Sequence, residues 1–428
     1  MYSILIYLFS LTPILIITGP FLSGLSTVII AIYGIYNFRY FNIIKDNKIL
    51  KVFLFLFILF SVYIIILSFF SPIPEESYKS SLFYFRFVFF ALGSYFLMIN
   101  FKDKIYKLLL YSLMFSFCIV FTSILIELFC LYFYPKYEND GQLTGIFFSE
   151  KIAGSYISRF FPILIGLIYL SNIKIITKHK NNLLIIFFLI SLISVLLSGE
   201  RTSIIIFFLS NLFMIIGLKF YRKVLFNKKS ILSILIFLIF FSIFGNRIFD
   251  RVIYKTLNQI KDTDGINIFT PHHESHLITA YNMFSENKIF GIGPRMFRFL
   301  CDNDKYIHIY DYELQYRNNG TVKFVEGKPL VKYYNGCSTH PHNVLAQIIS
   351  ETGLVGFIFY IYLILFIYFE LFKNIFRKKN SYQNIMIIVA LASLCSSFFP
   401  FIPSNSFFGS YINIFYFFII SIYLSEKK

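Results

Sequence analysis

The most informative segment of the chain covers residues 340–372 and reads HPHNVLAQIISETGLVGFIFYIYLILFIYFELF. It begins with two histidines, His340 and His342, and leads into an apolar run at 353–372. About 20 apolar residues in a helix are enough to cross the hydrocarbon core of a bilayer. The segment therefore predicts a membrane-spanning helix that starts beside titratable side chains, and such chemistry at a membrane edge indicates an enzyme.

The rest of the chain repeats this apolar pattern. Of its 428 residues 57% are hydrophobic, with 58 Phe, 32 Tyr and no Trp, which is more apolar surface than a soluble domain of this length needs. We predict an all-α polytopic membrane protein with about 12 transmembrane helices. The apolar runs lie at 2–18, 20–37, 52–71, 82–99, 108–134, 149–170, 182–198, 202–219, 230–246, 353–372, 384–400 and 406–424.

The charged residues between these runs predict the orientation. If the N-terminus is cytoplasmic, the segments that face inward carry most of the Lys and Arg residues, and the positive-inside rule then places both termini in the cytoplasm. The net charge of +17 follows from this topology, and no soluble basic face indicates nucleic-acid binding. The first apolar run has no basic residue before it and no small-residue cleavage site after it, so we expect a retained helix and not a removed signal peptide.

One long polar segment, residues 245–342, interrupts the apolar pattern on the outer face. Helical apolar spacing at 247–260 and 275–284, with a turn at Gly291–Pro294, predicts short helices joined by ordered loops. The chain thus divides into nine predicted spans at 1–244, the polar segment, and a further helix with the last three spans at 343–428.

Histidines concentrate in the polar segment, which holds six of the seven. Pro341 biases His340 toward an extended backbone, in which residues two apart point to the same side, so His340 and His342 are expected to address one site. A polar stripe at helical spacing follows them, and it either contributes to that site or covers a helix lying on the membrane surface. The histidines are His272, His273, His276, His308, His340 and His342, and the stripe consists of Asn343, Gln347, Ser350 and Glu351.

Arginines form a second candidate set, made up of Arg86, Arg159, Arg201 and Arg295 in the predicted outer half of the protein. A charge within a span costs about 2.5 to 3.5 kcal/mol even on permissive scales, so it normally has a partner. Glu127 could form a structural ion pair with Arg86 or Arg159. Alternatively, planar guanidinium groups bind phosphate bidentately, and the set indicates a site for a diphosphate head group such as that of a polyprenyl diphosphate.

Two short patterns suggest metal binding but lack the usual context. Asp262-Thr263-Asp264 resembles the DxD of nucleotide-sugar glycosyltransferases, yet no alternation of strands and helices surrounds it. His272 and His276 have the spacing of zinc ligands on a helix, without evident third and fourth ligands. We expect neither a metal nor another cofactor.

Of the five cysteines, only Cys301 and Cys337 lie in the polar segment, whereas Cys118, Cys130 and Cys395 lie in apolar runs. An oxidising compartment allows a Cys301–Cys337 bridge, although two unlinked thiols fit the sequence as well. We predict the bridge, since Cys337 lies three residues before His340 and a disulfide there would hold the polar segment over the histidines.

Taken together, these residues resemble the O-antigen ligase superfamily of bacterial membrane glycosyltransferases, which includes O-antigen ligases and polymerases. The pattern His342-Asn343, nine residues, and Gly353-Leu354-Val355-Gly356 is similar to that family's His motif. Ser198–Thr202 is similar to its arginine-bearing turn, with Gly199-Glu200 before Arg201 where Ser or Thr is more usual. Residues 290–297, Phe-Gly-Ile-Gly-Pro-Arg-Met-Phe, are similar to its glycine-rich segment.

The resemblance implies a GT-C-like enzyme of the bacterial inner membrane whose polar segment is periplasmic. Its donor would be a glycan on undecaprenyl diphosphate, and its acceptor a sugar hydroxyl on lipid A-core, or on a second lipid-linked repeat in a polymerase. His342 would be the general base and His340 an orienting residue, with Arg201, Arg295, Arg159, Arg86 and Asn343 binding substrate. Such a displacement would invert the anomeric centre without a metal.

A lipid-linked oligosaccharide transporter is the alternative from another class, because it would also have many spans and buried arginines. Inverted repeats and helices interrupted at the midplane would favour transport. The sequence contains neither feature, and a transporter would not need the long polar segment.

Overall fold

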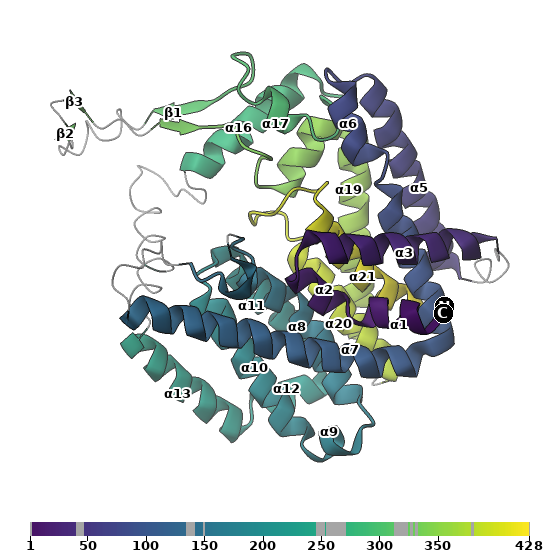
Figure 1. Ribbon diagram of the computed structural model, residues 1–428, viewed down its shortest axis with the longest axis vertical. Helices are drawn as coiled ribbons and strands as arrows, with labels where there is room; N and C mark the ends of the chain where they lie inside the picture. The colour runs from purple at the N-terminus through teal and green to yellow at the C-terminus, as the bar shows by residue number, and fades with distance from the viewer. Residues whose placement is uncertain are drawn as a thin grey trace.

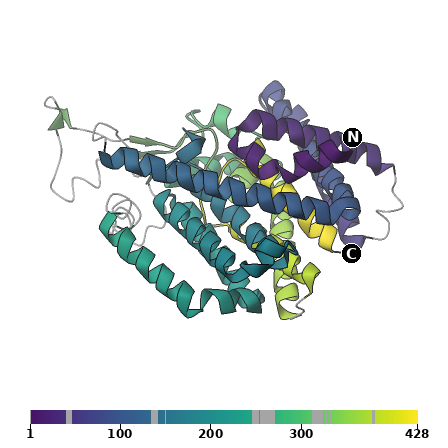
Figure 2. The ribbon, with the colours of Figure 1, turned by 60° about the horizontal axis from the view of Figure 1, so that its bottom comes forward.

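The protein is an all-helical multi-pass membrane protein (Figure 1). The computed structural model describes residues 2–39, 47–133, 142–148, 150–244, 253, 271–311, 324–325, 328–329, 333–377 and 381–427. Both termini lie at the same side of the molecule, on the right in both views (Figures 1 and 2).

The helices are α1 (Tyr2–Ser10), α2 (Thr12–Ile17), α3 (Pro20–Phe38), α5 (Lys48–Phe69), α6 (Pro74–Ser81), α7 (Phe85–Phe133), η1 (Gly145–Phe147), α8 (Ala153–Leu170), α9 (Lys174–Lys178), α10 (Lys180–Leu197), α11 (Arg201–Gly217), α12 (Lys219–Leu225), α13 (Lys228–Phe244), α16 (Pro271–Glu286), α17 (Phe297–Leu300), α19 (Val344–Phe376), α20 (Tyr382–Ser397) and α21 (Ser410–Glu426). The strands are β1 (Ile309–Asp311), β2 (Phe324–Val325), β3 (Lys328–Pro329) and β4 (Tyr333–Asn335).

Within the described residues, six helical stretches are long and apolar enough to cross a membrane, or seven if α11 and α12 count as one bent span. Residues 85–99 and 108–133 of the two apolar runs predicted at 82–99 and 108–134 lie in one helix, α7, whose backbone is non-helical at Phe101. α20 and α21 are apolar but shorter than a full span.

The core lies where α8, α20 and α21 pack together. Residues 153–168 of α8 are all buried, and nearly every side chain of α20 and α21 is buried as well. A helix that is apolar all round belongs inside a bundle. The backbones of α3 and α7 are in close contact at Gly34, where an added Cβ would lie 2.1 Å from the Phe89 carbonyl oxygen.

The polar segment contains strands as well as helices, so the prediction of helices and loops alone was incomplete. β1 pairs with β4 in an antiparallel ladder that aligns Ile309 with Asn335, and β2 pairs with β3. Helical spacing at 275–284 is confirmed by α16. The predicted helix at 247–260, apart from residue 253, and the Asp262–Asp264 pattern lie outside the described residues.

A break in α19 joins this segment to the bundle. Gly353 has φ 62° and ψ −165°, a conformation open essentially to glycine alone. The break exposes backbone carbonyls of α19, and the glycine-rich turn uses them: Ile292 N donates to Ser350 O at 3.0 Å and Gly293 N to Glu351 O at 2.9 Å. The two motifs recognised separately in the sequence are thus one structural unit.

Gly353→Ala is expected to lower the free energy of unfolding by about 2 to 4 kcal/mol, because the added Cβ combines backbone strain with an overlap. That Cβ would lie 2.3 Å from the Ile289 carbonyl oxygen. Circular dichroism at 222 nm during heating of the detergent-solubilised protein measures the effect. Gly24→Ala is the matched control, since its Cβ would meet nothing within 4 Å. Equal melting temperatures for the two variants would contradict the role given to Gly353.

Candidate active site

Four histidine rings gather at the start of α19. The ring centroid of His342 lies 4.3 Å from that of His340, 5.3 Å from His276 and 5.8 Å from His273. His273 and His276 come from α16, so the structure brings together residues about 65 positions apart in the chain, whose proximity their spacing does not predict. The prediction that His340 and His342 share one site is consistent with this short separation.

The backbone of His342 is in the left-handed region with φ 52°, which non-glycine residues seldom adopt. Its carbonyl oxygen accepts a 2.8 Å hydrogen bond from Ser404 N, in the loop between α20 and α21. Such conformations persist only where the surroundings hold them, and they cluster at functional sites.

His340 is held at both ring nitrogens. Nε2 lies 3.1 Å from the Ser404 carbonyl oxygen, which can only accept, so Nε2 carries the proton. Nδ1 then accepts from the Thr339 hydroxyl at 3.0 Å. Burial lowers the pKa of His340 from 6.5 to about 4, assisted by nearby Arg298 and His276 and opposed by the Ser404 bond. His340 is therefore neutral near pH 7 and has no ring nitrogen left to accept a substrate proton.

This pKa shift predicts a pH dependence of stability. Between about pH 6.5 and pH 4, His340 is protonated in the unfolded chain but not in the folded chain. The contribution of neutral His340 to the free energy of unfolding is therefore present above pH 6.5 and is lost as the pH falls toward 4. In His340→Gln, whose amide can still donate to Ser404, the melting temperature should fall less steeply over this range than in the wild type. Parallel melting curves for the two proteins would contradict the shift.

The polar stripe that follows is buried, so its interpretation as a surface-lying amphipathic helix was wrong for Gln347 and Glu351. Gln347, Ser350 and Glu351 are each at most 1% exposed. Gln347 donates to Glu351 Oε2 at 3.1 Å and accepts from Phe407 N at 2.7 Å. Burying these groups is tolerated because each one has hydrogen-bond partners.

Asn343, predicted to bind substrate, caps α19. Its Oδ1 accepts from Ala346 N at 3.1 Å and its Nδ2 donates to the Pro400 carbonyl oxygen at 3.0 Å. Asn is favoured at an N-cap because its side chain satisfies a free amide of the first turn. Both ends of the amide have protein partners, so Asn343 positions the preceding His342.

Arg295 lies beside Glu351, whose carboxylate binds backbone amides at the end of the glycine-rich turn. Glu351 accepts from Arg295 N and Phe297 N, each at 3.0 Å. Arg295 has φ 64°, a second left-handed residue at this site. Its guanidinium group makes no hydrogen bond or ion pair with any residue that the structure describes.

Arg298 is a site residue that the sequence analysis missed. Its Nη2 donates to the Thr339 carbonyl oxygen at 3.3 Å, and its Nε is buried with no hydrogen-bond partner among the described residues. Burial is the main cause that lowers the pKa of Arg298, and the positive charge of nearby Arg295 lowers it further. Its position in the sequence, three residues after Arg295, was the available signal.

Helix α6 packs against the glycine-rich turn. Ser77 Oγ donates to the Pro294 carbonyl oxygen at 3.0 Å and lies 2.9 Å from Ser68 Oγ. Its neighbour Glu76 is close enough to Arg295 and Arg298 that their charges help lower the pKa of its carboxyl, after the larger effect of the Lys79 hydrogen bond.

A second group of site candidates surrounds the start of α21. Arg159 is 2% exposed in α8, and its guanidinium carbon lies 6.0 Å from the Phe415 ring centroid. Arg86 donates to Ser410 Oγ at 2.9 Å. Neither arginine pairs with Glu127, which accepts from Thr144 N and Gly145 N instead. The structural ion pair considered from the sequence is therefore wrong.

Arg201 is the first residue of α11, directly after Glu200 in the turn between two helices. Glu200 accepts from Gly154 N at 2.7 Å and Ser155 N at 3.2 Å, at the start of α8. Burial raises the pKa of the Glu200 carboxyl to about 8, opposed by these amides and by Arg159. The Gly-Glu that departs from the family's usual turn thus connects α11 to α8.

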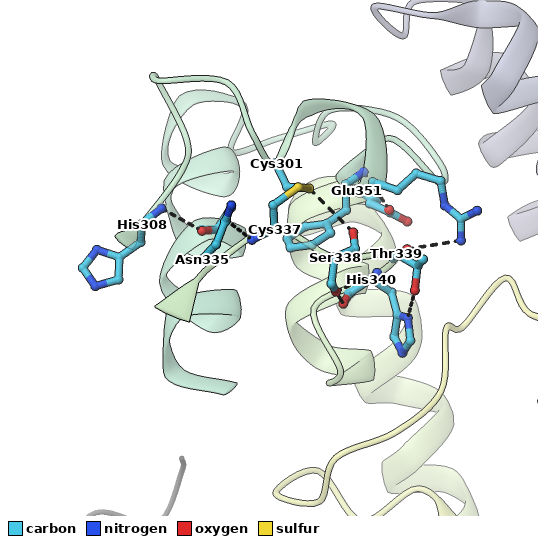
Figure 3. Close-up of a disulfide and its surroundings, with 11 residues drawn as sticks. Cys301, His308, Asn335, Cys337, Ser338, Thr339, His340 and Glu351 are labelled. Carbon is cyan, nitrogen blue, oxygen red and sulfur yellow. Dashed lines mark hydrogen bonds between the residues drawn. A yellow bond between two sulfur atoms is a disulfide. The ribbon is translucent and has the colours of Figure 1, made fainter. Parts of the chain in front are cut away.

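Cys301 and Cys337 form the predicted disulfide, which joins α17 to the segment after β4 (Figure 3). Cys301 is fully buried, and Glu351 and His340 are drawn close to the bridge in the same view. Ser338 and Thr339 connect Cys337 directly to His340, so the bridge fixes the chain just before the histidines.

Reduction of this disulfide should lower the free energy of unfolding by about 3 to 4 kcal/mol, because it releases a closed loop of 36 residues. Maleimide labelling of the denatured, unreduced protein should modify Cys118, Cys130 and Cys395 only. Five modified cysteines without a reductant would show that the bridge is absent.

The described residues contain no group of three or more His, Cys, Asp or Glu side chains that could hold a metal ion. His276 belongs to no such group, and the side chain of His272, which has the spacing of a zinc ligand relative to it, lies outside the described part of the chain.

Comparison with known proteins identifies the part of the chain that carries this site. Residues 186–361 match the sequence model of a family described as O-antigen ligase. This part of the chain is an O-antigen ligase domain. It belongs to a family of membrane enzymes that transfer glycans in lipopolysaccharide biosynthesis. The domain contains the four histidines, Arg201, Arg295, Arg298 and the disulfide, whereas Arg86 and Arg159 lie before it. No curated protein matches the chain.

Proposed function

We propose that this protein transfers a glycan from undecaprenyl diphosphate to a sugar hydroxyl on lipid A-core, as an inverting, metal-independent O-antigen ligase. The observation that carries the proposal is the position of His342 within the O-antigen ligase domain. Its left-handed backbone is held by Ser404, and three other histidine rings surround it.

The reaction needs a base and an anion site. The acceptor oxygen attacks the anomeric carbon, the bond from that carbon to the diphosphate oxygen breaks, and the diphosphate leaves with the electron pair. Neutral His342 takes the proton of the acceptor hydroxyl. His340 orients it, because the bonds to Ser404 and Thr339 already occupy both nitrogens of that ring.

Arginine side chains would stabilise the charge that develops on the leaving diphosphate. Arg295 is suited to this role because its guanidinium group has no partner among the described residues, and Arg298 lies near it. Arg201 is assigned to the same diphosphate, and Arg159 and Arg86 to the lipid-linked substrate more generally. Asn343 contributes by fixing the start of α19.

The proposal includes a topology. The protein would lie in the bacterial inner membrane with about 12 spans, both termini in the cytoplasm and the polar segment in the periplasm. The donor would enter from the membrane and the acceptor from the periplasm, where no nucleotide is needed because the diphosphate linkage supplies the driving force.

Deletion of the gene, followed by electrophoresis of the surface polysaccharide, tests the proposal. Core without attached repeats, together with accumulated lipid-linked polymer, is expected for a ligase. Core carrying a single repeat would show a polymerase that joins lipid-linked repeats. Accumulation of unpolymerised donor on the cytoplasmic side would show a transporter.

A further inference from the structure

A second candidate site lies at the C-terminal end of α8, the end opposite Gly154 and Ser155. A cavity of about 330 Å³ is lined by Tyr169, Lys219, Phe220, Lys223 and Ile385. These residues come from the end of α8, from α12 and from the start of α20. None of them belongs to the candidate active site.

The bend between α11 and α12 precedes the helix that supplies three of the lining residues. The two helices meet at 117°, so α12 turns away from the direction of the apolar helix α11. Leu218, Tyr221 and Leu225 are buried and hold α12 against the protein, and the Tyr221 hydroxyl bonds to Asn211 of α11. α12 therefore lies where an apolar span ends, and its basic residues, Lys219, Arg222 and Lys223, are exposed.

Two positive charges face the cavity. Lys219 and Lys223 are four residues apart, on one side of α12. Neither lysine forms an ion pair with any residue in the described part of the chain. A cavity with two ammonium groups and no carboxylate partner complements an anion.

The remaining wall is apolar and aromatic. The Tyr169 and Phe220 rings stack with centroids 3.4 Å apart and planes 9° apart, and Lys180 Nζ lies 5.1 Å from the Tyr169 centroid. A ligand that pairs with the lysines would thus also contact an apolar surface. That combination suits an amphiphile better than a soluble anion.

We propose that this cavity binds the head group of an anionic phospholipid. Its phosphate pairs with Lys219 and Lys223 while the adjoining glycerol and acyl chains pack beside Tyr169 and Phe220. Basic pockets between membrane helices are known to bind such head groups, and each lysine near a membrane surface adds measurable attraction to anionic lipid. The assignment is independent of the glycosyl transfer proposed above.

Native mass spectrometry of the full-length protein tests the site. The protein is released from micelles containing equal amounts of phosphatidylglycerol and phosphatidylethanolamine, and the bound lipids are counted. Lys219→Gln/Lys223→Gln should reduce retention of phosphatidylglycerol by on the order of tenfold and leave phosphatidylethanolamine unchanged. Lys228→Gln/Lys229→Gln removes the same charge from the start of the neighbouring α13, and it should retain phosphatidylglycerol as the wild type does.

Two outcomes would overturn the proposal. Equal losses in the two double variants would mean that general surface charge attracts the lipid. Displacement of phosphatidylglycerol by millimolar inorganic phosphate would mean that the cavity binds a soluble anion. Melting temperatures within about 2 °C of the wild type show that the variants are folded.

Discussion

His342→Asn is expected to lower the rate of glycan transfer by at least 10²-fold, the loss typical of a missing general base. Asn suits the test better than Ala, because it tolerates the left-handed backbone that His342 adopts at φ 52°. The substitution removes the imidazole while keeping the Ser404 hydrogen bond to the backbone. Transfer is measured with purified protein and undecaprenyl diphosphate-linked donor, and in a deletion strain by gel.

His308→Asn is the matched control, from the same polar segment. The His308 ring points away from the disulfide and from His340 (Figure 3), and only the His308 backbone bonds to Thr279 and Gly336. This variant should retain transfer. Full activity of a well-expressed His342→Asn variant would remove His342 from the role of base.

Arg295→Lys is expected to lower kcat/KM by on the order of 10²-fold, and Arg201→Lys by a comparable factor. Lysine keeps the charge but lacks the planar, bidentate donor pair that matches a phosphate. Arg298→Lys should show a smaller loss, since part of the Arg298 guanidinium group already bonds to Thr339.

The measurement separates donor binding from turnover, using the purified variants over a range of donor concentration. Arg377→Lys, at the exposed end of α19, controls for the general effect of exchanging Arg for Lys. If Arg201→Lys and Arg295→Lys both keep the wild-type kcat/KM, the diphosphate binds elsewhere.

The local features of the site were predictable. Asn343 is a favoured N-cap residue and Gly353 a helix breaker, and both act as such. The cysteines of the polar segment formed the expected bridge. The cap and the break depend on residue type and neighbours in the chain, and the bridge was predictable because the polar segment holds only two cysteines.

Other pairings between residues far apart in the chain were not predictable. Glu351 and Gln347 have the spacing of a surface stripe, but tertiary packing buries them beneath the amides of residues 295, 297 and 407. Glu127 was the nearest acidic candidate for the buried arginines, but the amides of residues 144 and 145 occupy its Oε2 instead. A backbone amide competes well for a buried carboxylate, and amides leave no sign in residue composition.

The membrane class, the helical architecture and the position of the His motif before α19 could be predicted from the sequence, because apolar run length and motif spacing are local properties of the chain. Only the tertiary structure placed His273 and His276 beside His342, docked the glycine-rich turn on the break at Gly353, and set Arg298 next to Arg295. These contacts depend on which backbone groups a helix break leaves unpaired and on which surfaces can then approach them.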